Sequence, residues 1–263
     1  MSSIIRSNPL ATVGHVLMIF MAAIGRLTLF TRDILLEGFR PPYYPRQLWR
    51  MVVEIGYYSL PVVGLTTLFT GAALALQSYS GFSNFGAESS IPVIVALAIT
   101  RELGPVMAGL MVAGRIGAAF AAELGTMRVT EQIDALVTLS TNPYKYLLFP
   151  RLLAAALMLP CLVFVGDVIG IFGGYMVSVQ ALHFAPLPYI NNTWDFLSWF
   201  DMRIGLVKAA VFGSLVALMG CYHGFHSKGG AQGVGAATTN AVVSASILIL
   251  LANYLLTEAF FKA

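Results

Sequence analysis

The sequence predicts an all-α integral membrane protein with five transmembrane helices, preceded by an N-terminal helix that lies in the membrane interface. Composition carries the first part of this prediction. Of the 263 residues, 58% are hydrophobic and 10% are charged, against about 45–50% and about 25% in soluble globular domains. The mean hydropathy of +0.80 agrees with that difference. Five predominantly apolar runs of 19 to 32 residues supply the helices, since a span requires about 20 residues.

The first 52 residues form an N-terminal cytoplasmic and interfacial region. Residues 10–24 are apolar, but 15 residues are too few to cross the hydrocarbon core comfortably. Arg26 and Arg32 follow and would lie among lipid headgroups, so we expect a helix in the cytoplasmic interface. A sixth span and a cleaved signal peptide are alternatives, although residues 21–26 offer no clean A-x-A cleavage site. Three prolines break the chain before the first full span, at Pro41, Pro42 and Pro45.

Residues 53–263 form the transmembrane region. The five apolar runs are residues 53–79, 91–122, 152–182, 204–222 and 237–257. The segments between them are too short to fold as a soluble domain, which usually needs at least about 50 residues. With the N-terminus inside, the cytoplasmic segments carry ten Lys and Arg residues and the opposite side carries two, Arg203 and Lys262. This bias predicts a cytoplasmic N-terminus and an external C-terminus.

Motifs of nucleotide-binding and hydrolytic sites are absent from the sequence. No run reads G-x-x-x-x-G-K-[ST], and Gly233 and Gly235 do not complete G-x-G-x-x-G, so ATP would have to be bound by another chain. H-E-x-x-H and G-x-S-x-G are absent too. His223 and His226 lack further ligands, so we expect no metal site. Both cysteines, Cys161 and Cys221, lie inside apolar runs, where we expect buried and inert thiols.

Arg101 and Glu102 are the most informative charges, because they would lie near the bilayer midplane. A charge there costs about 2.5–3.5 kcal/mol, so each should face a polar cavity, a partner or a subunit interface. Neighbouring helix positions point about 100° apart, so the two cannot simply neutralise each other. Lys208 in the fourth span is the expected partner of Glu102. The charges either fix helix packing or form the polar floor or gate of a substrate cavity, and we favour the second.

Three further charges lie within the spans. Glu54 and Arg115 are near predicted cytoplasmic ends, where long side chains can snorkel to the interface. Asp167 lies among small residues that allow close helix packing, namely Gly166, Gly170, Gly173 and Gly174. For Asp167 we expect a packing role with a satisfied carboxylate.

The cytoplasmic segment after the second span predicts a short amphipathic helix over residues 123–136, which residues 141–143 end. Apolar side chains alternate there with charged ones: Leu124, Met127, Ile133 and Leu136 with Arg128, Glu131 and Asp134. The whole segment has 29 residues, which is long for a connection in a protein made of spans. We therefore expect a docking surface for a cytosolic partner, and an ordinary solvated connector is the alternative.

Several stretches together identify a family. The chain reads RELGP at residues 101–105, GRIGAA at 114–119 and AELGTMRVTEQIDAL at 122–136, and its last span opens with ATTNAVV at 237–243. These stretches resemble the permeases of MCE-associated ABC transporters, the MlaE/YrbE family. The likeness covers nearly the whole chain and is densest over residues 101–151. It implies an ABC-permease fold whose coupling helix lies at about residues 123–140.

The resemblance implies a homodimeric permease in the bacterial inner membrane. Such a permease moves phospholipid, or a related lipid, between that membrane and a hexameric periplasmic MCE-domain protein, and so maintains outer-membrane lipid asymmetry. Two cytosolic ABC ATPase subunits would bind ATP and magnesium, often with a STAS-domain protein beside them. This chain would then be a transport subunit with no enzymatic activity and no cofactor of its own, and its C-terminus would be periplasmic.

The resemblance also implies two sets of site residues. Matched to the family's pattern, the lipid-binding positions are Leu74, Gln77, Phe82, Phe85, Arg101, Glu102 and Lys208. The ATPase-coupling positions are Glu123, Gly125, Arg128, Glu131, Gln132 and Asp134.

A proton-coupled carrier or channel that titrates Glu102 and Asp167 is the alternative from another functional class. It would work without an ATPase and would usually show an internal repeat, and we find no convincing repeat between the spans. A membrane scaffold whose buried charges only specify assembly is a further alternative.

Overall fold

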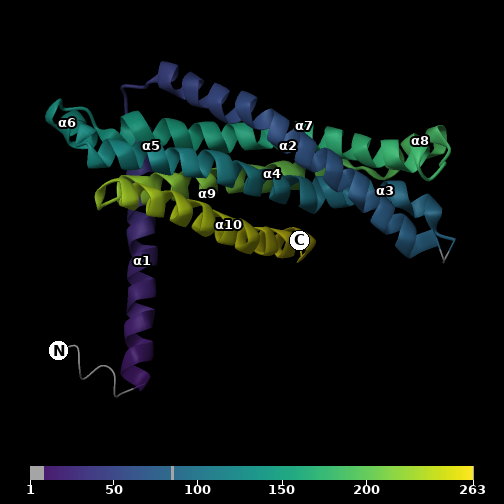
Figure 1. Ribbon diagram of the computed structural model, residues 1–263, viewed down its shortest axis with the longest axis horizontal. Helices are drawn as coiled ribbons and strands as arrows, with labels where there is room; N and C mark the ends of the chain where they lie inside the picture. Colours follow the sequence, from purple (N-terminus) through teal and green to yellow (C-terminus); the bar gives the residue numbers. More distant parts are fainter. Residues whose placement is uncertain (1–8, 84–85, 263) are drawn as a thin grey trace.

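The computed structural model describes residues 9–83 and 86–262, and these ranges contain no strand. Five helical rods run broadly along the long axis of the described chain (Figure 1). They are α2 (Pro45–Phe82), a composite rod from α3 to α5, α7 (Phe149–Gln180), α9 (Trp199–Phe225) and α10 (Gly230–Lys262). The prediction of an all-α membrane protein is confirmed, and each rod contains or closely overlaps one predicted span.

The first helix, α1 (Pro9–Gly38), runs across the other rods instead of along them (Figure 1). By length and composition alone, six segments of the described chain could cross a membrane, and Gly14–Gly38 in this helix is one of them. The apolar run at residues 10–24 is only part of this helix, because arginines end an apolar run but are good helix formers. Phe30 is buried and meets Tyr144 and Tyr222 edge to face, at 5.8 and 5.4 Å between ring centroids. These contacts anchor the end of α1 to the bundle.

Small residues bring α2 and α7 into close contact. A methyl group on Gly71 would collide with the carbonyl oxygen of Gly170, and one on Gly173 would collide with the carbonyl oxygen of Leu68. The predicted small-residue face of the third span is therefore confirmed as the surface on which α2 packs.

The second predicted span is a composite helix with two π-helical turns. Its segments are α3 (Ile91–Ala98), η4 (Ile99–Leu103), α4 (Gly104–Val112), η5 (Ala113–Gly117) and α5 (Ala118–Val129). Single π turns inside α-helices are rare and occur frequently at functional sites. Arg101 lies in η4 and Arg115 in η5. Both intramembrane arginines of this rod therefore lie on π turns.

The predicted amphipathic helix over residues 123–136 has the wrong boundaries. Its first half continues α5 as far as Val129, and its second half belongs to a separate helix, α6 (Gln132–Thr138). Between them Glu131 has φ of 61°, the left-handed region that an α-helix of L-residues avoids, so the helix must end there. The resulting α5–α6 hairpin lies at one end of the molecule, and α8 (Pro186–Phe196) lies at the other (Figure 1).

Candidate functional site

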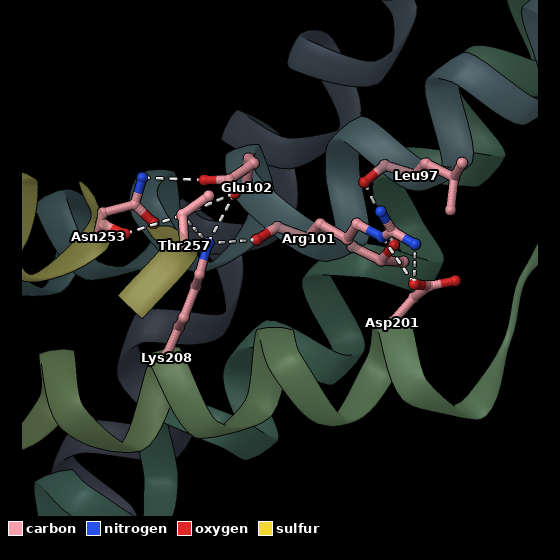
Figure 2. A network of polar contacts seen from close by, with 8 residues as sticks. Leu97, Arg101, Glu102, Asp201, Lys208, Asn253 and Thr257 are labelled. Carbon is pink, nitrogen blue, oxygen red and sulfur yellow. Dashed lines mark hydrogen bonds and ion pairs between the residues drawn. The ribbon is translucent and has the colours of Figure 1, made fainter. Parts of the chain in front are cut away.

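A network of charged and polar side chains joins η4, α9 and α10 (Figure 2). Lys208 Nζ donates to Glu102 Oε1 at 2.7 Å, which confirms the predicted pair. Asn253 Nδ2 donates to Glu102 Oε2 at 2.9 Å, and Thr257 Oγ1 lies 2.9 Å from Glu102 Oε1. Lys208 Nζ also lies 2.8 Å from Thr257 Oγ1. Both carboxylate oxygens of Glu102 are therefore occupied.

The third contact of Lys208 is with the backbone of the composite rod, four residues before Pro105. Lys208 Nζ donates to the backbone carbonyl oxygen of Arg101 at 3.0 Å. In an uninterrupted α-helix the N–H of residue 105 would donate to that same oxygen. Because proline has no N–H, residue 105 cannot make that bond, and the Arg101 carbonyl accepts from Lys208 on α9. The backbone of the segment Arg-Glu-Leu-Gly-Pro thus supplies a hydrogen-bond acceptor for the ammonium group of Lys208.

The side chain of Arg101 points away from Glu102 and toward Asp201 at the start of α9 (Figure 2). Arg101 Nε donates to Asp201 Oδ1 at 2.6 Å, and Arg101 Nη2 contacts the same oxygen. Ser198 caps α9 and orients Asp201: its backbone N–H and its hydroxyl both donate to Asp201 Oδ2, at 3.0 and 2.8 Å. Asp201 was not predicted from the sequence as a site residue. Its signal was the capping box Ser-x-x-Asp, which marks a helix start and does not by itself indicate a partner for Arg101.

The network is neutral in charge and divides into buried and accessible members. The side chains of Lys208 and Asp201 are 0% and 2% exposed, whereas those of Arg101 and Glu102 are 30% and 35% exposed. The buried members hold α9 against the composite rod. The accessible members present one guanidinium and one carboxylate to a molecule outside the fold. The network therefore both stabilises the packing of α9 on the composite rod and provides a polar surface.

Three further predicted lipid-binding residues lie on α2. Gln77 and Phe82 are exposed, and Leu74 is half-buried against the small core cluster of Ala75, Ile91, Val95 and Ile99. Phe85 lies outside the residues that the structure describes. The structure thus brings Arg101, Glu102 and Lys208 together, and it places Leu74, Gln77 and Phe82 on a separate helix.

Two expectations about individual residues are wrong. Arg115 does not snorkel: its guanidinium donates to the Ser59 hydroxyl at 2.9 and 3.1 Å and to the backbone carbonyl of Glu54, which ties η5 to α2. Cys221 is buried as expected, but Cys161 is exposed. An apolar sequence in a membrane helix does not require burial, because lipid solvates the outer face.

Asp167 departs from the expectation of a satisfied carboxylate. Its side chain is buried, yet Oδ1 has no hydrogen-bond partner and packs directly against Gly104. The sequence could not show whether the Asp167 carboxyl group has a hydrogen-bond partner. A face of small residues indicates close packing, but it does not show which polar groups lie opposite.

The predicted ATPase-coupling residues come together on the α5–α6 hairpin. Arg128 Nη1 and Asp134 Oδ1 form an ion pair at 2.6 Å across the turn, while Glu131 and Gln132 are exposed. At the base of the hairpin Glu123 Oε2 pairs at 2.7 Å with Nη2 of the buried Arg151. Gly125 packs against α10 and the loop before it. The hairpin also exposes three apolar side chains, Val129, Val137 and Leu139.

Comparison with known proteins agrees with the family resemblance. The model of the family Permease MlaE matches residues 48–259. A probable ABC transporter permease protein of Rickettsia felis is 55% identical over 95% of this chain and 97% of its own. The intermembrane phospholipid transport system permease protein MlaE of Haemophilus influenzae is 33% identical over 97% of this chain and 98% of its own. The chain therefore belongs to the MlaE permease family and is a multi-pass membrane subunit of an ABC transporter.

Proposed function

We propose that this permease moves phospholipid between the inner membrane and a periplasmic MCE-domain protein. The observation that carries the proposal is the accessible pair Arg101 and Glu102, which lies within a predominantly apolar helical bundle. A guanidinium matches the geometry of a lipid phosphate, and a neighbouring carboxylate limits how tightly that anion is held. The name of the Haemophilus relative, a permease of intermembrane phospholipid transport, supports the same cargo.

The acyl chains would lie on α2. Its exposed side chains include Leu65, Phe69, Leu76 and Phe82, which offer a long apolar surface. In the proposed homodimer, two such surfaces enclose a cavity that opens to the periplasm. Leu74, Gln77 and Phe82 form its walls, and Arg101, Glu102 and Lys208 form its polar floor.

Two cytosolic ATPase subunits would drive transport through the α5–α6 hairpin. Glu131 and Gln132 are exposed at the turn, next to the apolar Val137 and Leu139, which suits a docked protein better than open solvent. The hairpin continues directly into the composite rod that carries Arg101. Closure of the ATPases would push on this rod and collapse the cavity, delivering lipid to the MCE protein. A STAS-domain protein would bind the ATPase side.

The same proposal implies an orientation of the chain across the membrane. The α5–α6 hairpin and α8 lie at opposite ends of the bundle (Figure 1). With the hairpin in the cytoplasm, α1 lies along the inner surface of the membrane and the C-terminus faces the periplasm.

A titrating role for Glu102, as in a proton-coupled carrier, is less well supported, because the Lys208 ammonium and two further side chains already occupy its carboxylate.

The test is to purify the tagged chain gently from native membranes and to identify bound lipids and proteins by mass spectrometry. Co-purification of an ATPase, an MCE-domain protein and stoichiometric phospholipid is expected. In the variant Arg101→Gln, phospholipid occupancy should fall, whereas Arg203→Gln, an exposed position on the same helix as Asp201, should retain it. Recovery of the chain alone would contradict the ATP-driven mechanism, and equal lipid occupancy in both variants would remove Arg101 from the lipid site.

A further inference from the structure

A pocket lies between α7, α8 and the first turns of α9, and it borders the central network through Thr100 and Met202. Its volume is about 440 Å³, within the range of about 300–1,000 Å³ typical of small-molecule sites. Apolar and aromatic side chains form most of the wall: Phe164, Val168, Ile171, Phe172, Tyr175, Tyr189, Ile190, Trp194, Leu197 and Met202. Three polar residues complete it, Thr100, Asp167 and Thr193.

Asp167 is the only ionisable carboxyl group among these lining residues, and no Lys, Arg or His accompanies it. Its side chain is 9% exposed, and Oδ1 has no hydrogen-bond partner. Thr100 and Thr193 are committed elsewhere, because each hydroxyl donates to a carbonyl of its own helix at 2.9 Å. Burial disfavours the charged form of a carboxyl group that has no compensating charge, and a cation bound beside Asp167 would restore that form.

Aromatic rings surround the pocket that holds this carboxyl group. Tyr175 stacks on Phe172 at 6.4 Å between ring centroids and meets Tyr189 edge to face at 5.6 Å. Burial raises the pKa of Tyr189 on α8, so its phenol stays neutral and adds no second negative charge. Aromatic faces attract cations, and they do so more strongly where water is excluded. The ring cluster and the carboxyl group thus favour the same kind of ligand.

The outer rim of the pocket is open and apolar. Phe164, Val168 and Phe172 on α7 are exposed, and Trp194 on α8 is 72% exposed. These residues belong to α7 and α8, and α8 lies at one end of the described chain (Figure 1). Their exposed apolar side chains suit contact with lipid. A ligand could therefore enter sideways from the membrane, with an apolar body along the rim and a polar group at the floor.

We propose that this pocket binds a cationic amphiphile, a protonated amine carried on an apolar body, with the ammonium group at Asp167 and the body against Phe172 and Trp194. An anionic headgroup is disfavoured, because the pocket offers no basic side chain and would place a phosphate beside a carboxylate. The site is thus chemically distinct from the Arg101 surface assigned to phospholipid above, and it does not depend on that assignment.

The experiment compares three probes with the same tail and different heads: dodecylamine, dodecanol and dodecanoate. Each is titrated against the full chain in nanodiscs of zwitterionic lipid, and retention of the isotope-labelled probe is measured. We expect dodecylamine to bind at least tenfold more tightly than dodecanol, and dodecanoate to bind weakest. Asp167→Asn keeps the shape of the side chain and should abolish the preference for the amine.

Asp195→Asn is the matched control, since Asp195 is an exposed carboxylate on α8 next to Trp194. It should leave the amine affinity unchanged. Equal binding of the three probes to the native chain would overturn the proposal, as would undiminished amine binding by Asp167→Asn or an equal loss in Asp195→Asn. If Asp167→Asn does not fold, Trp194→Ala provides the second variant. Its side chain is largely exposed, and its loss should weaken dodecylamine binding several-fold; an unchanged affinity would refute the pocket as the site.

Discussion

Replacing Lys208 with methionine tests whether the central network stabilises the bundle. The ammonium group is fully buried and contacts Glu102, the Arg101 carbonyl and Thr257 at 2.7 to 3.0 Å. Removing one partner of a buried ion pair costs about 3–5 kcal/mol, because the other charge is left uncompensated. Glu102 is 35% exposed and keeps Asn253 and Thr257, so solvent and those groups offset part of the loss. We expect Lys208→Met to lower the free energy of unfolding by about 2–3 kcal/mol.

The double variant Glu102→Gln with Lys208→Met separates the ion pair from the rest of the network. Removing both charges with little change of volume should restore most of the lost stability, which gives a coupling energy of about 2 kcal/mol in a double-mutant cycle. The assay is reversible unfolding in mixed detergent micelles, followed by far-ultraviolet circular dichroism. Lys228→Met, at an exposed loop position, is the control and should change little. If the effects of the two single variants simply added, the pair would not be coupled and the reasoning would be refuted.

Three further predictions concern packing, coupling and lipid contact. Gly71→Ala should lower the free energy of unfolding by about 1–3 kcal/mol in the same assay, since its methyl group would meet the Gly170 carbonyl, whereas Gly81→Ala has no neighbour within 4 Å and should be neutral or slightly stabilising. Glu131→Lys should uncouple ATP hydrolysis from lipid transfer in reconstituted vesicles while the bundle stays folded, and unchanged transfer would contradict the coupling role. Phe82→Asp should abolish lipid occupancy measured by mass spectrometry, because a charge would face the acyl chains; normal occupancy would remove Phe82 from the cavity wall.

The composite rod explains how these sites can be related physically. One continuous helical unit carries the α5–α6 hairpin at one end, Arg115 and its α2 contacts further along, and Arg101 and Glu102 toward its other end. A displacement of the hairpin would reach the charged network without crossing a loop. The two π turns are the places where the hydrogen-bond register of this rod could change.

Several features of the protein were predictable from the sequence because they depend on local composition. Long apolar runs must form helices in lipid, where every backbone polar group needs an internal partner, so the five bundle helices followed directly. The pairing of Glu102 with Lys208 was also predictable, since few charges lie within the spans and an unpaired one is costly there. The dense motifs from Arg101 to Leu136 identified the family before any contact was known.

Contacts between distant segments required the tertiary structure. Asp201 stands 100 residues from Arg101, and only the packing of α9 against η4 makes it the partner. The left-handed turn at Glu131, the inward contacts of Arg115 and the exposed Cys161 likewise depend on how neighbouring segments pack. The same holds for Asp167, whose apolar and glycine-rich surroundings predicted close packing but could not show that its carboxyl group faces a pocket without a partner. Hydropathy and helical periodicity determine which segments enter the membrane, but which faces meet there is decided by the fit of all the helices together.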